Sequence, residues 1–154
     1  MNEFINHFFF GIYPYIAISV FALGSLARFE REQYTWKSDS SQLLKRGQLR
    51  WGSNLFHLGI IALFFTHLVG LLTPLSVFHA FGITVQMKQA MAIVGGLSLG
   101  LVCLGGLLLL IHRRYTEPRI RANTKWTDWL TVLWILLALL LGLATIPVSM
   151  QHSD

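Results

Sequence analysis

The sequence contains one cysteine, Cys103, and few charged residues. A lone cysteine excludes an internal disulfide, and it excludes an iron–sulfur cluster held by a set of cysteine thiolates. Lysine, arginine, aspartate and glutamate make up 12% of the chain, whereas about 25% is usual for a soluble domain. No lysine or arginine precedes the first apolar run, so the N-terminus lacks the pattern of a secretory signal peptide. The low charge argues against a soluble globular domain.

Long hydrophobic runs occupy most of the chain instead. Four segments are apolar over the roughly 20 residues that a helix needs to cross a bilayer core of about 30 Å. They lie near residues 4–27, 52–72, 89–111 and 129–148. The sequence therefore predicts an all-α, polytopic transmembrane bundle of four membrane-spanning helices, in one membrane domain that covers residues 1–154.

The basic residues gather on one side of these predicted helices. Of the 12 lysines and arginines, six lie between Arg28 and Arg50 and five between Arg113 and Lys125, whereas Lys88 lies on the other side. An excess of basic residues in short loops marks the cytoplasmic face. We therefore predict cytoplasmic loops at 28–51 and 112–128 and both termini outside. Because topology explains the positive net charge, it does not point to a nucleic-acid partner.

Two histidines, His57 and His67, lie inside the second apolar run. Imidazole is costly in hydrocarbon, so an intramembrane histidine marks a candidate functional site. A separation of ten residues corresponds to about 15 Å along a helix axis. This distance is too long for one shared metal ion and suits two metal centres, one in each leaflet of the bilayer.

The choice of residues favours haem at these centres. A zinc site needs three or four side-chain or water ligands, and no predicted helix offers further histidine, cysteine or carboxylate at matching depth. Haem needs only one or two axial side chains. The sequence contains no Cys-x-x-Cys-His attachment motif, so the haem would be b-type. The alternative is that each histidine merely donates a hydrogen bond to a neighbouring helix.

Several other residues have ordinary interpretations. We expect Cys103 to be a small buried apolar residue. The remaining histidines are expected to be solvated, and they are His7, His79, His112 and His152. His112 lies toward the same side of the membrane as His57 and is therefore a weaker candidate for its partner. Thr127 is a candidate N-cap for the fourth helix.

Two groups of residues admit two interpretations each. The third apolar run is rich in glycine, which either leaves room for flat macrocycles or allows close helix packing: Gly95, Gly96, Gly100, Gly105 and Gly106. The arginines between Arg113 and Lys125 either pair with haem propionates or serve only as the positive-inside signal and as lipid headgroup contacts.

Multi-residue motifs then identify a family. In chain order they are Ile12-Tyr-Pro-Tyr-Ile16, Gln33-Tyr-Thr-Trp36, Ser53-Asn-Leu-Phe-His57, Leu72-Thr-Pro74, Lys88-Gln89, Pro118-Arg-Ile-Arg-Ala122 and Thr145-Ile-Pro147. In this order they resemble the gamma subunit of respiratory nitrate reductase, a membrane cytochrome b, along the whole chain.

The resemblance implies specific roles for three residues. The second helix of the family gives one axial ligand to each of two b haems, which implies His57 for the proximal haem and His67 for the distal haem. Quinol is oxidised near the distal haem, and Lys88 occupies the place of a lysine that belongs to the quinol site. Without the resemblance, Lys88 would be interpreted as an interfacial lysine that extends to the lipid headgroups.

The resemblance also implies partners and a location. They are membrane lipid, quinol as electron donor, a cytoplasmic iron–sulfur beta subunit and a molybdenum alpha subunit that reduces nitrate, at a bacterial cytoplasmic membrane. In the family a fifth helix supplies the second axial histidine of both haems. This sequence stops at Asp154, before such a helix, so we expect it to provide one axial ligand per haem.

Two other functions remain open from the sequence. One is a haem-less membrane anchor or truncated remnant, in which His57 and His67 have no spectral role. The other is a cytochrome b subunit of another quinol-linked reductase, which keeps the haems but has different soluble partners.

Overall fold

The computed structural model describes residues 2–32, 34 and 46–151. These residues form helices and turns and no strand, which confirms the predicted all-α class. His152, half of the predicted loop 28–51 and part of the Gln33–Trp36 motif lie outside the described residues. The chain divides into two compact units, residues 1–38 and 39–154, and each is described by itself.

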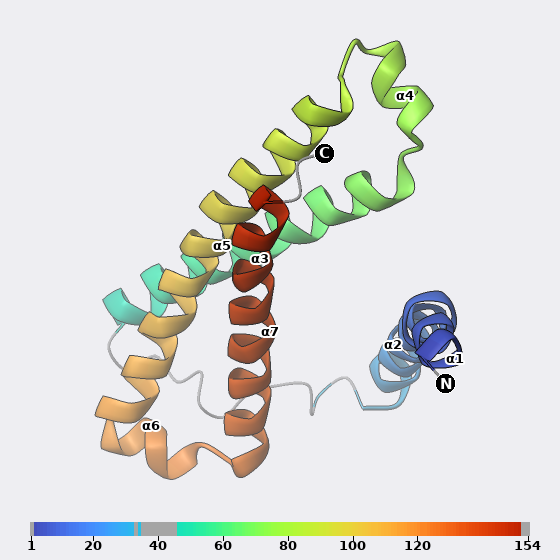
Figure 1. Ribbon diagram of the computed structural model, residues 1–154. Helices are drawn as coiled ribbons and strands as arrows, with labels where there is room; N and C mark the ends of the chain where they lie inside the picture. The colour runs from blue at the N-terminus through green and yellow to red at the C-terminus, as the bar shows by residue number, and fades with distance from the viewer. Residues whose placement is uncertain (1, 33, 35–45, 152–154) are drawn as a thin grey trace. The chain divides into compact units, whose positions relative to one another are not determined.

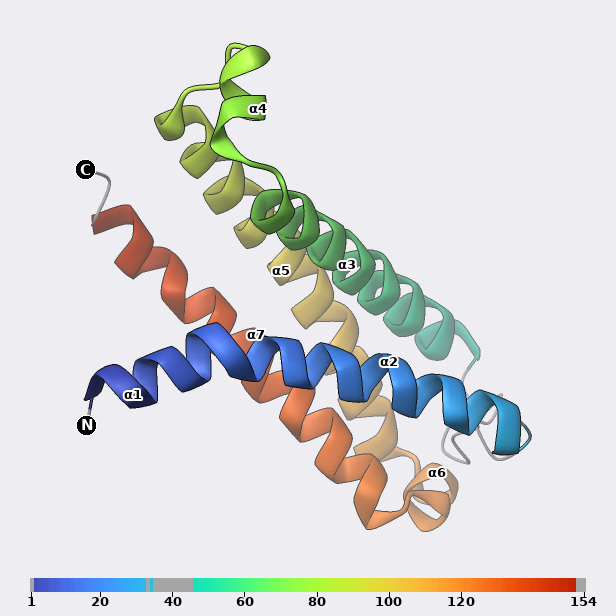
Figure 2. The same ribbon diagram turned by 90° about the vertical axis from the view of Figure 1, so that its right-hand side faces the viewer.

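The first unit is helical throughout its described length. It consists of α1 (Asn2–Asn6), the π-helical turn η1 (His7–Ile12) and α2 (Tyr13–Glu32), and the blue ribbon runs through all three without a break (Figure 2). The π turn ends just before Pro14, which cannot donate a backbone hydrogen bond and whose ring crowds the carbonyl four residues earlier. A wider turn at this point lets the helix continue past the proline.

The second unit contains two long antiparallel helices and a third that packs against one of them. The helices are α3 (Arg46–Leu72), α4 (Leu75–Ala80), α5 (Val85–Thr116), α6 (Pro118–Asn123) and α7 (Trp126–Gln151). The short α4 joins α3 to α5, and the short α6 joins α5 to α7 (Figure 1). Helix α5 contacts both α3 and α7. The sequence did not predict α4 and α6.

Among the residues that the structure describes, four helices are long and apolar enough to cross a membrane, as predicted. They cover Glu3–Glu32, Arg46–Leu72, Val85–Thr116 and Trp126–Gln151. Each extends past the predicted apolar run because hydropathy detects only the part that crosses hydrocarbon, whereas helical hydrogen bonding continues into the polar interface. The direction in which the helices cross the membrane stays a prediction.

Local capping explains where α5 and α7 begin. The Thr84 hydroxyl accepts a hydrogen bond from the Met87 backbone N–H at 3.2 Å, as an N-cap side chain does. At α7 the Asp128 carboxylate accepts from the backbone N–H of Lys125 at 3.2 Å, the backward half of a capping box. Thr127 lies inside α7, so the prediction that it caps this helix is wrong.

The tightest packing joins the N-terminal half of α3 to the C-terminal half of α5. A Cβ atom on Gly59 would lie 2.6 Å from the Cβ of Cys103, and one on Gly106 would lie 2.8 Å from the Gly52 carbonyl oxygen. Cys103 is buried, as predicted. At Gly106 the glycine therefore permits close helix packing, which was one of the two interpretations offered for it.

Little else in the described chain is buried. The buried hydrophobic side chains among the described residues are Cys103, Leu107 and Ile120, and large apolar side chains on every long helix are exposed. Soluble monomers rarely expose large contiguous apolar surfaces. Such exposure is expected for helices whose outer faces contact lipid or other membrane helices.

Candidate functional site

Both predicted ligand histidines lie on α3 and make the same backbone hydrogen bond. Nδ1 of His57 lies 2.7 Å from the carbonyl oxygen of Ser53, and Nδ1 of His67 lies 2.7 Å from the carbonyl oxygen of Leu63. A carbonyl can only accept, so Nδ1 carries the proton in each ring and Nε2 keeps its lone pair. Metal-ligating histidines typically have this arrangement, because the second ring nitrogen fixes the tautomer and the ring orientation.

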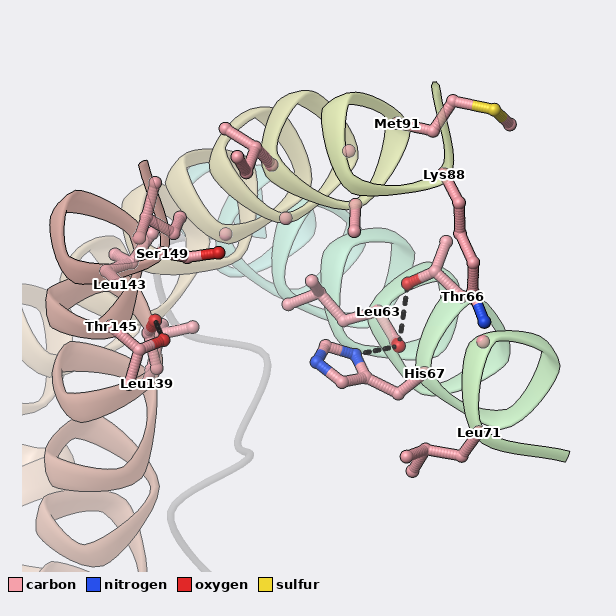
Figure 3. A pocket seen from close by; sticks show the side chains of 18 of the residues that line it. Leu63, Thr66, His67, Leu71, Lys88, Met91, Leu139, Leu143, Thr145 and Ser149 are labelled. Carbon is pink, nitrogen blue, oxygen red and sulfur yellow. Dashed lines mark hydrogen bonds between the residues drawn. The ribbon is translucent and has the colours of Figure 1, made fainter. Parts of the chain in front are cut away.

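The hydroxyl groups beside the two rings differ. At His57 the Ser53 hydroxyl oxygen lies 3.2 Å from the same Nδ1, so it accepts a second, weaker hydrogen bond from the ring N–H. At His67 the Thr66 hydroxyl instead donates to the Leu63 carbonyl at 2.9 Å, and this oxygen is already the acceptor for His67 (Figure 3). The Ser53 hydroxyl therefore gives the His57 ring a second acceptor, whereas the Thr66 hydroxyl competes with the His67 ring for the Leu63 carbonyl.

His67 faces a cavity between three helices, and Lys88 lines the same cavity. The cavity has a volume of about 550 Å³ and is bordered by residues of α3, α5 and α7. In Figure 3 the His67 ring, on α3, and the side chain of Lys88, on α5, extend into the space between these two helices. The structure thus brings together two of the three predicted site residues, which are 21 positions apart in the sequence.

The rest of the cavity wall is mostly apolar and contains several glycines. A Cβ atom on Gly70 or Gly95 would meet no other atom within 4 Å. A Cβ on Gly100, which also lines the cavity, would lie 2.7 Å from Leu143. The interpretation that the glycines of the third apolar run leave room for flat macrocycles stays a prediction. Polar groups are contributed by these lining residues: Thr66, His67, Lys88, Thr145 and Ser149.

Helix α7 supplies one wall of the cavity, which the sequence did not predict. Thr145 and Ser149 line it, and the Ser149 carbonyl accepts a hydrogen bond from the Gln89 side chain at 2.9 Å. The available signal was two small polar residues, four positions apart, in the apolar C-terminal half of this helix. No sequence pattern assigns Thr145 and Ser149 to the same site as Lys88, because the assignment depends on the packing of α5 against α7.

Lys88 contacts an aromatic ring of α4. Its Nζ lies 4.4 Å from the centroid of the Phe78 ring, within the range of a cation–π interaction. Both side chains are half-buried. The lysine is therefore held at this edge of the cavity by a residue that the sequence did not indicate.

His57 lies apart from this cavity. Its ring is exposed in the described chain and contacts Phe56 edge to face, with ring centroids 5.4 Å apart. His112, the weaker candidate for its partner, is also exposed, and no hydrogen bond joins the two histidines in the part of the chain that the structure describes. Within residues 2–32, 34 and 46–151, no group of three or more His, Cys, Asp or Glu side chains gathers as a metal cluster.

The arginines at the end of α5 have partners within the chain. Arg113 is buried, with 3% of its surface exposed. The Arg114 guanidinium donates to the Asp128 carbonyl at 3.1 Å and lies 5.8 Å from the Trp129 ring centroid. These contacts link α5 to the start of α7, a structural role that neither interpretation of this basic segment included.

The sequence matches the family model of the nitrate reductase gamma subunit over residues 6–154. It is 45% identical over 152 residues to the respiratory nitrate reductase 1 gamma chain of Escherichia coli, covering 99% of this chain and 67% of that one. It is 46% identical over 155 residues to the respiratory nitrate reductase 2 gamma chain of the same organism, covering 68% of it.

A gamma chain from a second bacterium is also similar to this sequence. The nitrate reductase gamma chain of Bacillus subtilis is 38% identical over 134 residues, which are 87% of this chain and 60% of that one. The sequence therefore spans about two thirds of the length of these gamma chains.

Proposed function

The chain belongs to the nitrate reductase gamma subunit family, and from this we propose that it conducts electrons from membrane quinol toward the nitrate-reducing subunits. As a family member it is a membrane subunit of an oxidoreductase complex and not the catalytic subunit. The observation that carries the proposal is the placement of His67 and Lys88 around one cavity.

The donor chemistry of His57 and His67 fits haem b. Each ring donates its Nδ1 proton to a carbonyl and leaves Nε2 as a ligand. We propose that His57 would hold the proximal haem and that His67 would hold the distal haem. Bound there, haem b would supply one-electron carriers between quinol and an iron–sulfur subunit.

The cavity beside His67 suits a quinol. Its volume of about 550 Å³ lies within the roughly 300–1,000 Å³ typical of small-molecule sites, which are mostly apolar with a few placed polar groups. The Lys88 ammonium donates a hydrogen bond to a quinol oxygen and stabilises the negative charge that develops as this oxygen loses its proton. The apolar walls from α5 and α7 hold the ring and its tail.

The proposal includes partners and a location. The basic loops next to α6 and before α3 would face the cytoplasm and meet an iron–sulfur beta subunit, which connects to a molybdenum alpha subunit that reduces nitrate. Oxidation of quinol near Lys88 would release its protons on the opposite side of a bacterial cytoplasmic membrane.

A reduced-minus-oxidised visible spectrum of the assembled complex tests the haem assignment. We expect the b-type absorbance to fall by about half in His57→Ala and by about half in His67→Ala, because each haem needs its axial ligands. His79→Ala, which replaces an exposed histidine of α4, is the matched control and should retain the full spectrum. The absence of b-type absorbance in the parent complex would support the haem-less anchor instead, and an unchanged spectrum in both ligand variants would contradict the assignment of His57 and His67 as ligands. A retained spectrum with different co-purifying subunits would support another quinol-linked reductase.

A further inference from the structure

Phe78 is placed to control the position of Lys88. The Lys88 Nζ lies 4.4 Å from the centroid of the Phe78 ring. A lysine side chain near a membrane interface is flexible and tends to extend toward the headgroups. Attraction to an aromatic face opposes this tendency, because the electron-rich ring stabilises the ammonium group.

The segment that carries Phe78 is fixed by its own hydrogen bonds. The Phe78 carbonyl accepts from the backbone N–H of Ile83 at 2.9 Å and from that of Phe81 at 3.1 Å. Gly82 makes this turn possible, since its φ of 74° lies in the left-handed region that favours glycine. The ring of Phe78 is therefore presented by a closed turn rather than by a free loop.

The backbone of Lys88 is fixed as well. Its N–H donates to the Thr84 carbonyl at 2.9 Å, in the first turn of α5, which the Thr84 side chain caps. Both residues of the Phe78–Lys88 contact thus belong to one short, internally hydrogen-bonded segment that runs from α4 to the first turn of α5. The lysine side chain is the flexible part, and the aromatic ring limits where it can go.

We propose that Phe78 is a positioning residue that holds the Lys88 ammonium at the edge of the cavity, where it can meet a quinol oxygen. Figure 3 shows the side chain of Lys88 extending from α5 toward Thr66 on α3 rather than away from the cavity. This inference rests on the proposed function, because it assumes that Lys88 binds quinol. It adds α4 to the site as the element that orders the lysine.

The test uses the assembled complex with five variants: Phe78→Leu, Phe78→Tyr, Lys88→Ala, the double variant Phe78→Leu/Lys88→Ala, and Phe81→Leu. Phe81 is an aromatic residue of the same turn that is 79% exposed, which makes it the matched control. Two quantities are measured: the KM for menadiol in nitrate reduction, and the Kd of a fluorescent hydroxyquinoline N-oxide as a quinol analogue. Haem absorbance per complex reports whether each variant assembles.

We expect Phe78→Leu to raise both constants about three- to tenfold, the range that loss of a cation–π contact corresponds to. Phe78→Tyr keeps an aromatic face and should stay within about twofold of the parent. Phe81→Leu should leave both constants unchanged. Lys88→Ala should raise them further, and adding Phe78→Leu to it should have no additional effect, because Phe78 acts through the lysine.

Two results would overturn the inference while the proposed function stands. One is a change in Lys88→Ala with none in Phe78→Leu, and the other is an equal effect of Phe78→Leu with and without the lysine. If Lys88→Ala itself changes neither constant, the proposed role of Lys88 in quinol binding is wrong, and the inference falls with it. If Phe78→Leu lowers the haem absorbance, Phe78→Met replaces it as a non-aromatic variant whose unbranched, flexible side chain fills irregular gaps better.

Discussion

The two halves of the α3–α5 pair use glycine in opposite ways. Toward α6, Gly59 and Gly106 let the two helices approach until an added Cβ would collide with the facing helix, and a Cβ on Gly52 would lie 3.1 Å from Leu110. Toward α4, Gly70 and Gly95 face open space beside the cavity. The same missing side chain permits close contact at Gly106 and leaves open space at Gly95, so the role of a glycine depends on what lies against it.

The two histidines divide between these halves. His57 follows Phe56, whose backbone lies against Gly106 in the packed half, and His67 borders the cavity in the open half. Helix α3 is thus held firmly near one histidine and borders a ligand-sized space near the other. We infer that the packed half fixes the position of α3, on which the geometry of the open half depends.

The largest effect is expected from one added methyl group in the packed half. Gly106→Ala would place a Cβ 2.8 Å from the Gly52 carbonyl oxygen and against the Phe56 backbone, neither of which can move as a flexible side chain does. We expect a loss of about 3 kcal/mol in the free energy of unfolding, near the upper end of overpacking effects. Thermal denaturation of the purified protein in detergent measures it.

Gly105→Ala is the matched control for that change. A Cβ on Gly105 meets no atom within 4 Å, so Ala should be neutral or slightly stabilising because it favours the helix. Equal denaturation temperatures for the two variants would contradict the packing of α3 against α5.

How much of this arrangement the sequence could predict depends on whether a feature is local. The four spans follow from length and hydropathy, and Cys103 is buried as its residue type suggests. His67 and Lys88 were selected from one intramembrane position and one family motif, and the structure places them around a common cavity. The quinol and haem assignments themselves stay predictions.

The features that the sequence did not predict depend on contacts between distant segments. Gly105 and Gly106 are adjacent and identical, yet only Gly106 faces α3, and the helix crossing decides this rather than any local pattern. Phe78 reaches Lys88 only because Gly82 closes the turn after α4. The α7 wall of the cavity likewise requires the packing of α5 against α7.

A second change fills space in the open half. Gly95→Leu would place a large side chain in the cavity, where nothing lies within 4 Å of the new Cβ. We expect at least about a tenfold loss of quinol-dependent nitrate reduction, a transition-state effect of about 1.4 kcal/mol, with stability and haem absorbance unchanged. Steady-state kinetics with menadiol measure the loss.

The control for the cavity variant is Gly105→Leu, which also adds leucine at an open position of α5 but does not line the cavity. It should keep the parent rate. If Gly95→Leu also keeps that rate, the cavity is not the quinol site, although the packing argument for the other half would be unaffected.

The smallest expected effect separates the two histidines by the hydroxyl beside each. Thr66→Val removes the hydroxyl that shares the Leu63 carbonyl with His67, so the ring N–H gains a stronger acceptor and Nε2 becomes more electron-rich. Such a ligand stabilises oxidised iron, and we expect the midpoint potential of one haem to fall by about 20 mV, which corresponds to about 0.5 kcal/mol.

Ser53→Ala removes an acceptor from His57 and should raise the potential of the other haem by a similar amount. Thr131→Val, which removes a comparable hydroxyl–carbonyl bond on α7, should shift neither potential in a spectroscopic redox titration. Shifts of the same sign in the Thr66 and Ser53 variants would contradict the different roles of these hydroxyls, because one competes for an acceptor and the other provides one.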